Sequence, residues 1–220
     1  MNGCHFTFAG ADLTALPSGA LWWDRVQMLC VSDLHLGKSE RMARRGGPML
    51  PPYEARETLG RLEADIHAMA PEIVVCLGDS FDDLAAAHEI DAETLSWLNA
   101  LMAGRRWIWI EGNHDAGPVD IGGTNLHTLY EPPLMFRHIA QKTANGEVSG
   151  HYHPKARLNL RGRVITRRSF LFDASRLILP AYGTYTGGLE TQNDALSNLM
   201  APDAKAILLN DPPLMVPMPR

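Results

Sequence analysis

Short apolar runs that end abruptly in polar residues are the main pattern of this chain. The first three runs cover residues 26–31, 73–77 and 107–110, and a shorter one covers 134–136. The first three are rich in β-branched or aromatic residues and have the length of strands, so we predict that they are buried strands. Further short strand candidates in the second half are residues 147–149, 169–172, 177–179 and 206–209.

Between the first two runs the apolar residues recur every three or four positions. The stripe that they form consists of Leu59, Leu62, Ile66 and Met69. This spacing predicts an amphipathic helix, which prolines at 51–52 and at 71 delimit.

A second helix is predicted over residues 91–102, with Asp91 as its N-cap and Leu95, Leu98 and Met102 facing inward. Alternating strands and helices imply crossover connections and an α/β architecture. The second half has no long helix between its strand candidates, which suggests a second, more antiparallel sheet packed on the first. The proline-rich tail, residues 211–220, is expected to wrap the surface.

Composition narrows the class of protein. The chain has 220 residues, of which 45% are hydrophobic, enough for a substantial core and too many for a disordered chain. With no repeat and no Ser/Gly linker, we expect residues 1–220 to form a single domain. The net charge of −5 argues against a protein that holds nucleic acid by bulk charge, although it does not exclude nucleic acid as a substrate.

The sequence shows neither a transmembrane run nor a signal peptide. Cys4, Cys30 and Cys76 cannot all pair, and the last two lie in apolar runs. Buried free thiols are therefore favoured over a disulfide, and a cytoplasmic location fits best.

The apolar runs are followed by side chains that bind metals or move protons. These are Asp33, His35, Asp79, Asn113, His114, His138, His151 and His153. In α/β folds the carboxyl ends of strands are where sites assemble. The mixture of imidazole, carboxylate and amide without thiolate favours Mn, Fe or Zn over a structural zinc site or calcium.

Two pairs in this set share a spacing. Asp33 and His35 are two residues apart, as are His151 and His153, so on a strand each pair would point the same way. Gly78, Gly112 and Gly150 come directly before members of the set, where glycine permits a sharp exit from a strand.

The motifs Asp33-Leu-His35, Gly78-Asp79, Gly112-Asn-His-Asp115 and Gly150-His-Tyr-His153 resemble those of the calcineurin-like metallophosphoesterase superfamily. Residues 33–38, 78–81 and especially 179–189 resemble its ligase-associated DNA-damage-response endonuclease branch. This resemblance implies a four-layer α-β-β-α sandwich of two mixed β-sheets flanked by helices. It also implies a phosphodiesterase or endonuclease that acts on DNA, linked to repair and associated with DNA ligase and helicase.

The resemblance further implies two divalent metal ions, with Mn as the first choice and Fe, Zn, Co or Ni as alternatives. Asp33, His35 and His153 would hold one ion, and Asn113, His138 and His151 the other. Asp79 would bridge the two, because one carboxylate offers two oxygens. Ile139 follows His138 where the superfamily often has glycine, so His127 is kept as an alternative ligand.

For the reaction we expect a metal-generated hydroxide to attack phosphorus in line with the leaving group. His114, beside the ligand Asn113, is the candidate general acid. Gly78 to Asp82 has the Gly-Asp-x-x-Asp spacing of the protein phosphatases, which makes Asp82 the expected carboxylate partner of His114. Asp115 and Asp83 are the alternatives.

Two basic groups are candidates for contacts with the phosphate backbone of DNA. The first, directly after the first metal motif, is Lys38, Arg41, Arg44 and Arg45. The second is Arg161, Arg163, Arg167 and Arg168.

Two other functions compete with the DNA phosphodiesterase. The same site could serve a phosphomonoesterase or pyrophosphatase acting on a small phosphorylated metabolite. The fold could also persist as a non-catalytic interaction module, although no expected ligand is missing. The oligomeric state stays open.

Overall fold

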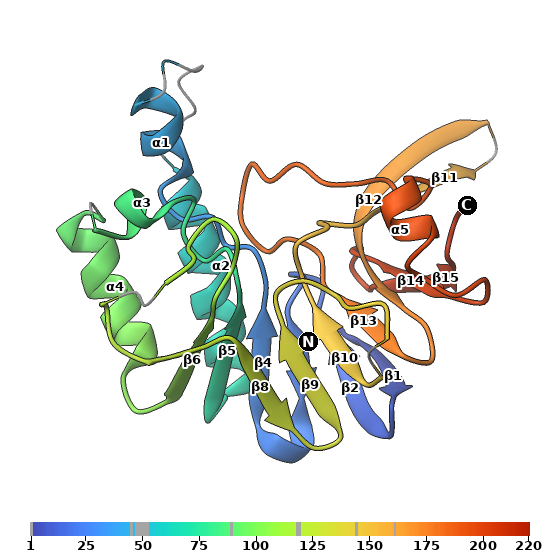
Figure 1. The fold of residues 1–220 in the computed structure, drawn as a ribbon, viewed down its shortest axis with the longest axis horizontal. Coiled ribbons are helices and arrows are strands. Elements are labelled where there is room, and N and C mark those ends of the chain that lie inside the picture. Colours follow the sequence, from blue (N-terminus) through green and yellow to red (C-terminus); the bar gives the residue numbers. More distant parts are fainter. Residues whose placement is uncertain are drawn as a thin grey trace.

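Two β-sheets lie face to face at the centre of the molecule (Figure 1). The structure is a computed structural model that describes residues 2–44, 46, 53–88, 90–117, 120–143, 145–160 and 162–220. The core between the sheets takes side chains from both, among them Val75 and Ile108 from the first and Val148 and Phe170 from the second.

The first sheet has the strand order β1-β2-β3-β4-β5-β6-β7. Its strands are β1 Cys4–Phe8, β2 Ala11–Ala15, β3 Leu21–Trp23, β4 Met28–Val31, β5 Ile73–Leu77, β6 Arg106–Ile110 and β7 Thr124–Leu126. Strands β1 to β4 are antiparallel to one another, and β4 to β7 are parallel. The pattern analysis predicted β4, β5 and β6 but none of the three N-terminal strands.

The helices are α1 Lys38–Arg44, α2 Glu54–Met69, α3 Leu84–His88, α4 Ala92–Met102, α5 Asp194–Ser197 and the 3-10 turn η1 Asp24–Val26. Helices α2 and α4 cover the outer face of the first sheet, where Leu62 and Leu98 pack against Val74 and Trp107. Both helices were predicted. In α4 the buried leucines are Leu98 and Leu101, while Leu95 and Met102 are half-buried.

The second sheet has the order β15-β14-β12-β13-β10-β9-β8, with β11 paired to β12 outside this path. Its strands are β8 Thr128–Glu131, β9 Leu134–Arg137, β10 Glu147–Ser149, β11 Lys155–Leu160, β12 Arg163–Phe172, β13 Arg176–Ile178, β14 Lys205–Leu208 and β15 Leu214–Pro217. Strand β10 is parallel to both of its neighbours, and the other pairings are antiparallel.

This arrangement confirms the expected α/β sandwich of two mixed sheets. The outer face of the second sheet carries a thinner layer, in which Leu196 of α5 packs with Met200, Ala204 and Met218. The C-terminal tail differs from the expectation: instead of only wrapping the surface, it supplies the edge strand β15, because Leu214–Pro217 pairs with β14.

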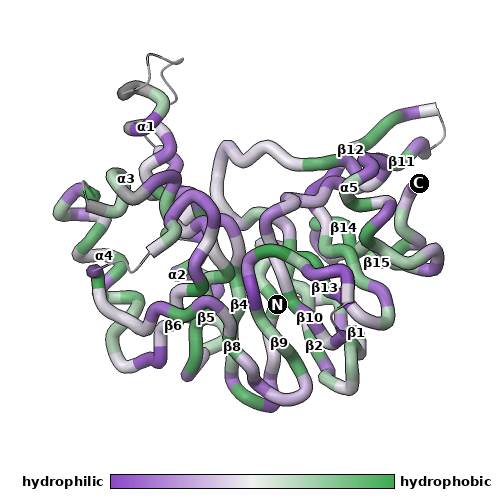
Figure 2. Tube along the Cα trace, viewed as in Figure 1, coloured by the Kyte–Doolittle hydropathy of each residue, from purple (hydrophilic) through white to green (hydrophobic). Residues whose placement is uncertain are grey.

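Figure 2 shows apolar residues concentrated along the central strands. All three cysteines are free, with Cys30 and Cys76 buried as expected, and burial raises the pKa of both thiols. Among the described residues no helix is long and apolar enough to cross a membrane.

The N-cap of α4 gives a direct test of the fold. The Asp91 carboxylate accepts hydrogen bonds from the backbone N–H groups of Glu93 and Thr94. Asp91→Ala should lower the free energy of unfolding by about 1 kcal/mol, measured by denaturant titration. Asp91→Asn, which keeps a capping oxygen, should stay close to wild type. Equal stability of the Ala variant and wild type would contradict the cap.

Candidate metal centre and active site

The predicted site residues gather at one end of the sandwich. Strands β4, β5 and β6 are parallel, so their carboxyl ends share one edge, and the loops that follow them carry Asp33, Asp79 and Asn113. His138 follows β9 directly, and the loop after β10 carries His151 and His153. The backbone N–H of His151 donates to the Asp33 carboxylate at 3.0 Å, which joins the second sheet to the first.

The backbone at these positions differs from the expected strand geometry. Strands β4 and β10 end at Val31 and Ser149, before the paired residues begin. Five site residues have left-handed backbone instead, with φ of 54° at Asp33, 47° at His35, 46° at Asp79, 71° at His151 and 45° at His153. Such a conformation costs roughly 1–3 kcal/mol in a residue with a side chain and concentrates at functional sites. Consecutive loop turns, not strand alternation, therefore aim these side chains.

Three glycines permit the loops to approach one another. A Cβ on Gly112 would lie 2.2 Å from the Asp79 Oδ1, and one on Gly150 would lie 1.8 Å from the Ser32 Oγ. A Cβ on Gly78 would lie 2.3 Å from the His138 ring. Any larger residue would push the loops apart.

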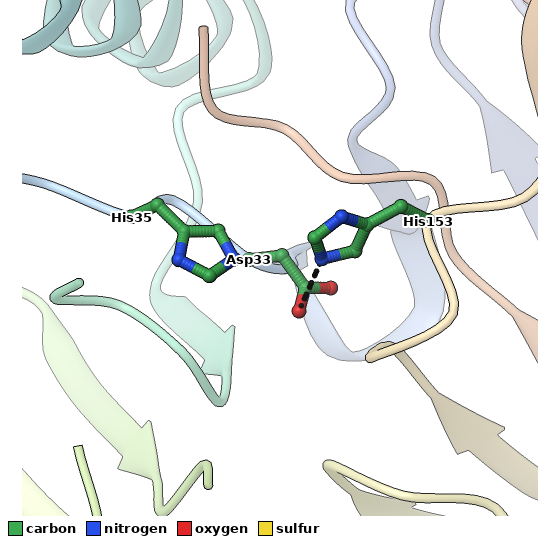
Figure 3. A group of neighbouring side chains, drawn as sticks. All are labelled: Asp33, His35 and His153. Carbon is green, nitrogen blue, oxygen red and sulfur yellow. Dashed lines mark ion pairs between the residues drawn. The ribbon is translucent and has the colours of Figure 1, made fainter. Parts of the chain in front are cut away.

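The first group of ligand-type side chains is Asp33, His35 and His153 (Figure 3). One possible ligand atom from each lies within 4.8 Å of the others. The His153 Nε2 is 3.0 Å from the Asp33 Oδ1. These three residues are the set that the resemblance implied for one ion.

The second group is Asp79, His138 and His151, by the same distance criterion. Asn113 belongs beside it, since its Oδ1 lies 3.0 Å from the His138 Nε2. A third group, His35, Asp79 and His114, overlaps both. The third group shares His35 with the first group and Asp79 with the second, so the two sets of ligand-type residues are adjacent.

The hydrogen bonds of the histidines leave lone pairs directed at the site. The His138 Nδ1 donates to the Leu77 carbonyl at 3.0 Å, so its Nε2 faces both the Asn113 Oδ1 and the Asp79 Oδ2, the latter at 3.3 Å. The His35 Nε2 is buried and has no hydrogen-bond partner in the described part of the chain. Converging acceptors and an unpaired buried nitrogen fit a pair of divalent cations.

The electrostatics of the two carboxylates and of His151 favour the same interpretation, whereas at His138 the hydrogen bond and charge of Asp79 and the charge of Asp33 outweigh burial and raise the pKa. Burial alone would raise the pKa of Asp33 and of Asp79, but hydrogen bonds and charge from His153 and His138 outweigh it and lower both pKa values. Burial, assisted by the charge of His138, lowers the pKa of His151. At neutral pH the carboxylates are therefore ionised and the His151 imidazole is neutral, as metal ligands must be.

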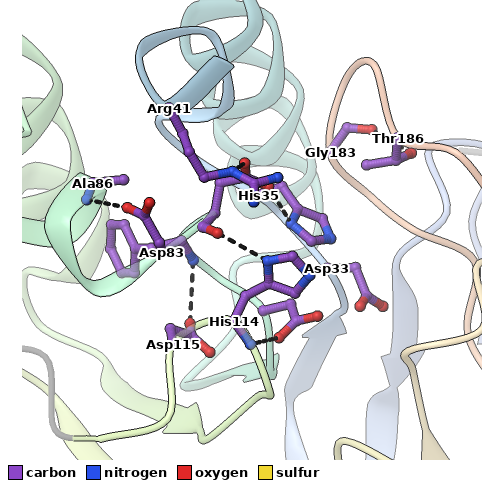
Figure 4. A network of polar contacts seen from close by, with 12 residues as sticks. Asp33, His35, Arg41, Asp83, Ala86, His114, Asp115, Gly183 and Thr186 are labelled. Carbon is purple, nitrogen blue, oxygen red and sulfur yellow. Dashed lines mark hydrogen bonds and ion pairs between the residues drawn. The ribbon is translucent and has the colours of Figure 1, made fainter. Parts of the chain in front are cut away.

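The expected pairing of the Asp82 carboxylate with His114 is wrong. That carboxylate is fully buried and binds the His35 Nδ1 at 2.9 Å and the Arg41 guanidinium. Figure 4 shows the side chains of His35, Arg41 and His114 close to one another. The Nδ1 of His114 instead donates to the backbone carbonyl of Asp82 at 2.9 Å. The loop turns so that the carbonyl of Asp82 faces His114 while its side chain faces His35. Asp82 thus orients a ligand-type histidine, a common arrangement behind metal-binding imidazoles.

The two alternative partners of His114 have other contacts. The Asp115 carboxylate accepts from the backbone N–H groups of Ser80, Phe81 and Gly112, which ties the β5 and β6 loops together. The Asp83 carboxylate accepts from the backbone N–H of Ala86 at the start of α3.

His127, the alternative to His138, lies apart from this cluster. Its side chain is 84% exposed and its Nδ1 is 2.9 Å from the Glu111 carboxylate. Of the two histidines, the structure brings only His138 into the group of ligand-type side chains.

The first basic group is only partly described. Lys38 and Arg41 lie on α1, and Arg41 is engaged by Asp82. Arg45 lies outside the described residues, as does the side chain of Arg44. In the second group Arg163, Arg167 and Arg168 lie on β12, and Arg161 falls outside the described residues.

The stretch 179–189 packs against the loop that carries Asp33, a role that the sequence pattern did not reveal. The backbone N–H groups of Tyr182 and Gly183 donate to the carbonyls of Ser32 and Asp33. A Cβ on Gly183 would lie 2.1 Å from the Leu34 carbonyl oxygen. The buried Tyr182 hydroxyl donates to Asp65 of α2 at 2.9 Å. This stretch therefore holds the Asp33 loop against α2.

Comparison with known proteins gives this site a class. Residues 26–208 match the model of the calcineurin-like phosphoesterase family, and the chain belongs to that family. The protein is thus a metal-dependent phosphoesterase, a hydrolase. The family depends on two metal ions, for which the clusters above are the candidate ligands.

Among solved structures, the chain is similar to Pseudomonas putida nuclease MPE, with 25% identity, 97% of this chain and 100% of that chain covered, and a TM-score of 0.74. It also matches Yfce, a phosphoesterase from E. coli, with 13% identity over 87% of this chain and 99% of that one, at a TM-score of 0.41. No protein of curated function matches the sequence.

The two histidines that competed for one ligand position can be separated by metal content. His138→Ala should reduce the bound Mn from two ions to one per chain, because it removes an imidazole from the second group. His127→Ala, the matched control, should keep two. Elemental analysis after dialysis against Mn measures both, and the reverse pattern would contradict the assignment.

Proposed function

We propose that this protein is a dinuclear-metal-dependent phosphodiesterase that cleaves DNA, with Mn as its metal. The observation that carries this proposal is the pair of ligand-type groups, Asp33, His35 and His153 and Asp79, His138 and His151, which a third group containing His35 and Asp79 links. A phosphodiester is anionic and repels hydroxide, so its hydrolysis benefits most from two adjacent cations. We further propose a single domain over residues 1–220 and a cytoplasmic location, which the three free cysteines support.

The proposed ligands follow the two groups. Asp33, His35 and His153 hold one ion. Asn113, His138 and His151 hold the other, and Asp79 contributes to both. When bound, the ions neutralise the phosphoryl oxygens and lower the pKa of water, so that hydroxide is available near neutral pH.

His114 is proposed as the general acid that protonates the leaving oxygen. Its Nδ1 donates to the Asp82 carbonyl, and its backbone N–H donates to the Asp79 Oδ1 at 2.9 Å. The first hydrogen bond orients the ring with its Nε2 available for proton transfer, and the second holds the backbone of His114 beside Asp79. The ring lies edge-on to His35 with centroids 5.0 Å apart, which supports a position next to the reacting phosphate.

The choice of DNA rests on the likeness to the Pseudomonas putida nuclease and on the motif resemblance to the DNA-damage-response branch. That resemblance also supports a role in DNA repair and an association with DNA ligase and helicase. A phosphomonoesterase or pyrophosphatase would use the same metal centre, so the substrate has to be tested directly.

A substrate panel tests this function. With Mn, the protein should cleave single-stranded or plasmid DNA and a small phosphodiester faster than a phosphomonoester or a pyrophosphate, and EDTA should abolish all turnover. Asp79→Asn, purified in parallel, excludes a contaminating nuclease. Turnover confined to the monoester or the pyrophosphate would overturn the proposal.

The role of His114 predicts a dependence on the leaving group. On a dinucleotide, whose alkoxide leaving group needs a proton, His114→Ala should lower kcat by about 10²–10⁴. On bis(p-nitrophenyl) phosphate, with its stable leaving group, the loss should be much smaller. His127→Ala serves as a control, and metal content should be unchanged. An equal loss on both substrates would remove His114 from this role.

A further inference from the structure

A two-stranded ribbon, β11 with the first six residues of β12, extends from the second sheet beside the site (Figure 1). Residues 155–160 pair with residues 163–168, whereas β12 joins β13 and β14 only from Ser169 onward. At about 3.4 Å per residue the ribbon is roughly 20 Å long. Its far end therefore lies well away from His153, which precedes the ribbon by two residues.

The charge of this ribbon is opposite to that of the whole chain. Between positions 155 and 168 the sequence contains six basic residues and no acidic one, although the chain carries a net charge of −5. The six are Lys155, Arg157, Arg161, Arg163, Arg167 and Arg168.

Two of these cations are engaged by the protein itself. Arg168 is half-buried and donates to the Ala181 carbonyl at 3.0 Å, so it anchors the stretch 179–189. Arg157 is 3.5 Å from Glu190, in a solvent-exposed pair of little energetic weight.

Among the residues that the structure describes, Arg163 and Arg167 have no such partner. Both are exposed, and within the described part of the chain neither forms an ion pair. Within the same described part, the Arg167 guanidinium donates a hydrogen bond to the adjacent Thr166 carbonyl alone. These two guanidinium groups are therefore accessible to an anionic partner.

The ribbon is tied directly to the metal-ligand loop. It begins two residues after His153, and the Lys155 N–H donates to the Leu189 carbonyl while the Leu189 N–H donates to the Tyr152 carbonyl. In Figure 1 the ribbon and α1 project from the same end of the molecule, on either side of the stretch 179–189. A nucleic acid strand that leaves the metal centre toward this side would run past the ribbon.

We propose that the β11–β12 ribbon binds the phosphodiester backbone of the nucleic acid beyond the two nucleotides that flank the cleaved bond, mainly through Arg163 and Arg167. The proposal rests on the proposed nuclease function. Backbone contacts of this kind position a strand and carry no sequence information.

The test compares substrates that do and do not reach the ribbon. For Arg163→Ala/Arg167→Ala, KM on a 20-nucleotide single strand should rise about 10- to 30-fold with little change in kcat. The slope of log Kd against log salt should fall by about 1.4, or 0.7 for each lost contact. Turnover of a dinucleotide, which is too short to reach the ribbon, should stay at the wild-type level. A 20-base-pair duplex measured in parallel shows which form of the backbone is preferred.

Two matched variants control for charge. Arg25→Ala/Arg106→Ala also removes two exposed cations, but these lie at the opposite end of the strands, before β4 and at the start of β6. It should bind like wild type. Arg163→Lys/Arg167→Lys, which keeps the charge, should recover most of the affinity.

The outcomes separate the two proposals. One outcome is that wild type binds and cuts the single-stranded 20-mer while Arg163→Ala/Arg167→Ala has the same KM and salt dependence as Arg25→Ala/Arg106→Ala. That result overturns the ribbon proposal and leaves the nuclease function standing. If wild type hydrolyses the dinucleotide but neither binds nor cuts either 20-mer, the proposed action on DNA fails, and the ribbon proposal fails with it.

Discussion

The carboxylate of Asp33 joins the loops of the two sheets at the site, and the rest of the candidate metal centre depends on it. Asp33 follows a strand of the first sheet, yet it accepts hydrogen bonds from the Ser32 hydroxyl and from the His151 N–H of the second sheet. Its ion pair with the His153 Nε2 adds a third contact. Each proposed ligand set takes residues from both sheets, so neither set exists unless the sheets pack in this register. Gly150 shows how closely the loops of the two sheets approach, because a Cβ at this position would overlap Ser32.

The hydrophobic core fixes that register. Leu77, Ile110, Phe136 and Val148 are buried between the sheets within a few residues of the site side chains that follow them. A slip of one residue in any of these strands would turn its buried side chains outward and displace the loop after it. The free energy of apolar burial therefore supports the strained left-handed backbone at Asp33, His35 and Asp79, whose side chains make a site only when all the loops are in place. The residues that stabilise the fold and the residues that form the site thus lie next to each other at the ends of the same strands.

This coupling explains what the sequence could and could not predict. The runs 73–77 and 147–149 match β5 and β10 residue for residue, and Asp91 caps α4. These features could be predicted because the pattern of apolar residues and the capping side chain are local properties of the sequence. The three short N-terminal strands were missed. In the first of them, polar and apolar residues alternate from His5 to Phe8, and the apolar ones are buried. The direction of the Asp82 side chain could not be predicted. It depends on how one loop turns against another, and the Gly-Asp-x-x-Asp spacing of residues 78–82 does not encode that turn.

The position of Asp82 also changes the interpretation of the first basic group. Arg41 was expected to face the substrate, but its guanidinium binds the buried carboxylate that orients His35. The Asp82 carboxylate neutralises the charge of Arg41, so this cation stabilises the site and attracts a polyanion only weakly. Arg163 and Arg167, by contrast, are exposed and meet no carboxylate among the described residues. Attraction of an anionic chain depends on charge near the surface that it follows and not on the net charge of −5. An acidic protein can therefore act on nucleic acid when its unpaired cations are collected on one projecting element, and among the described elements the β11–β12 ribbon has that composition.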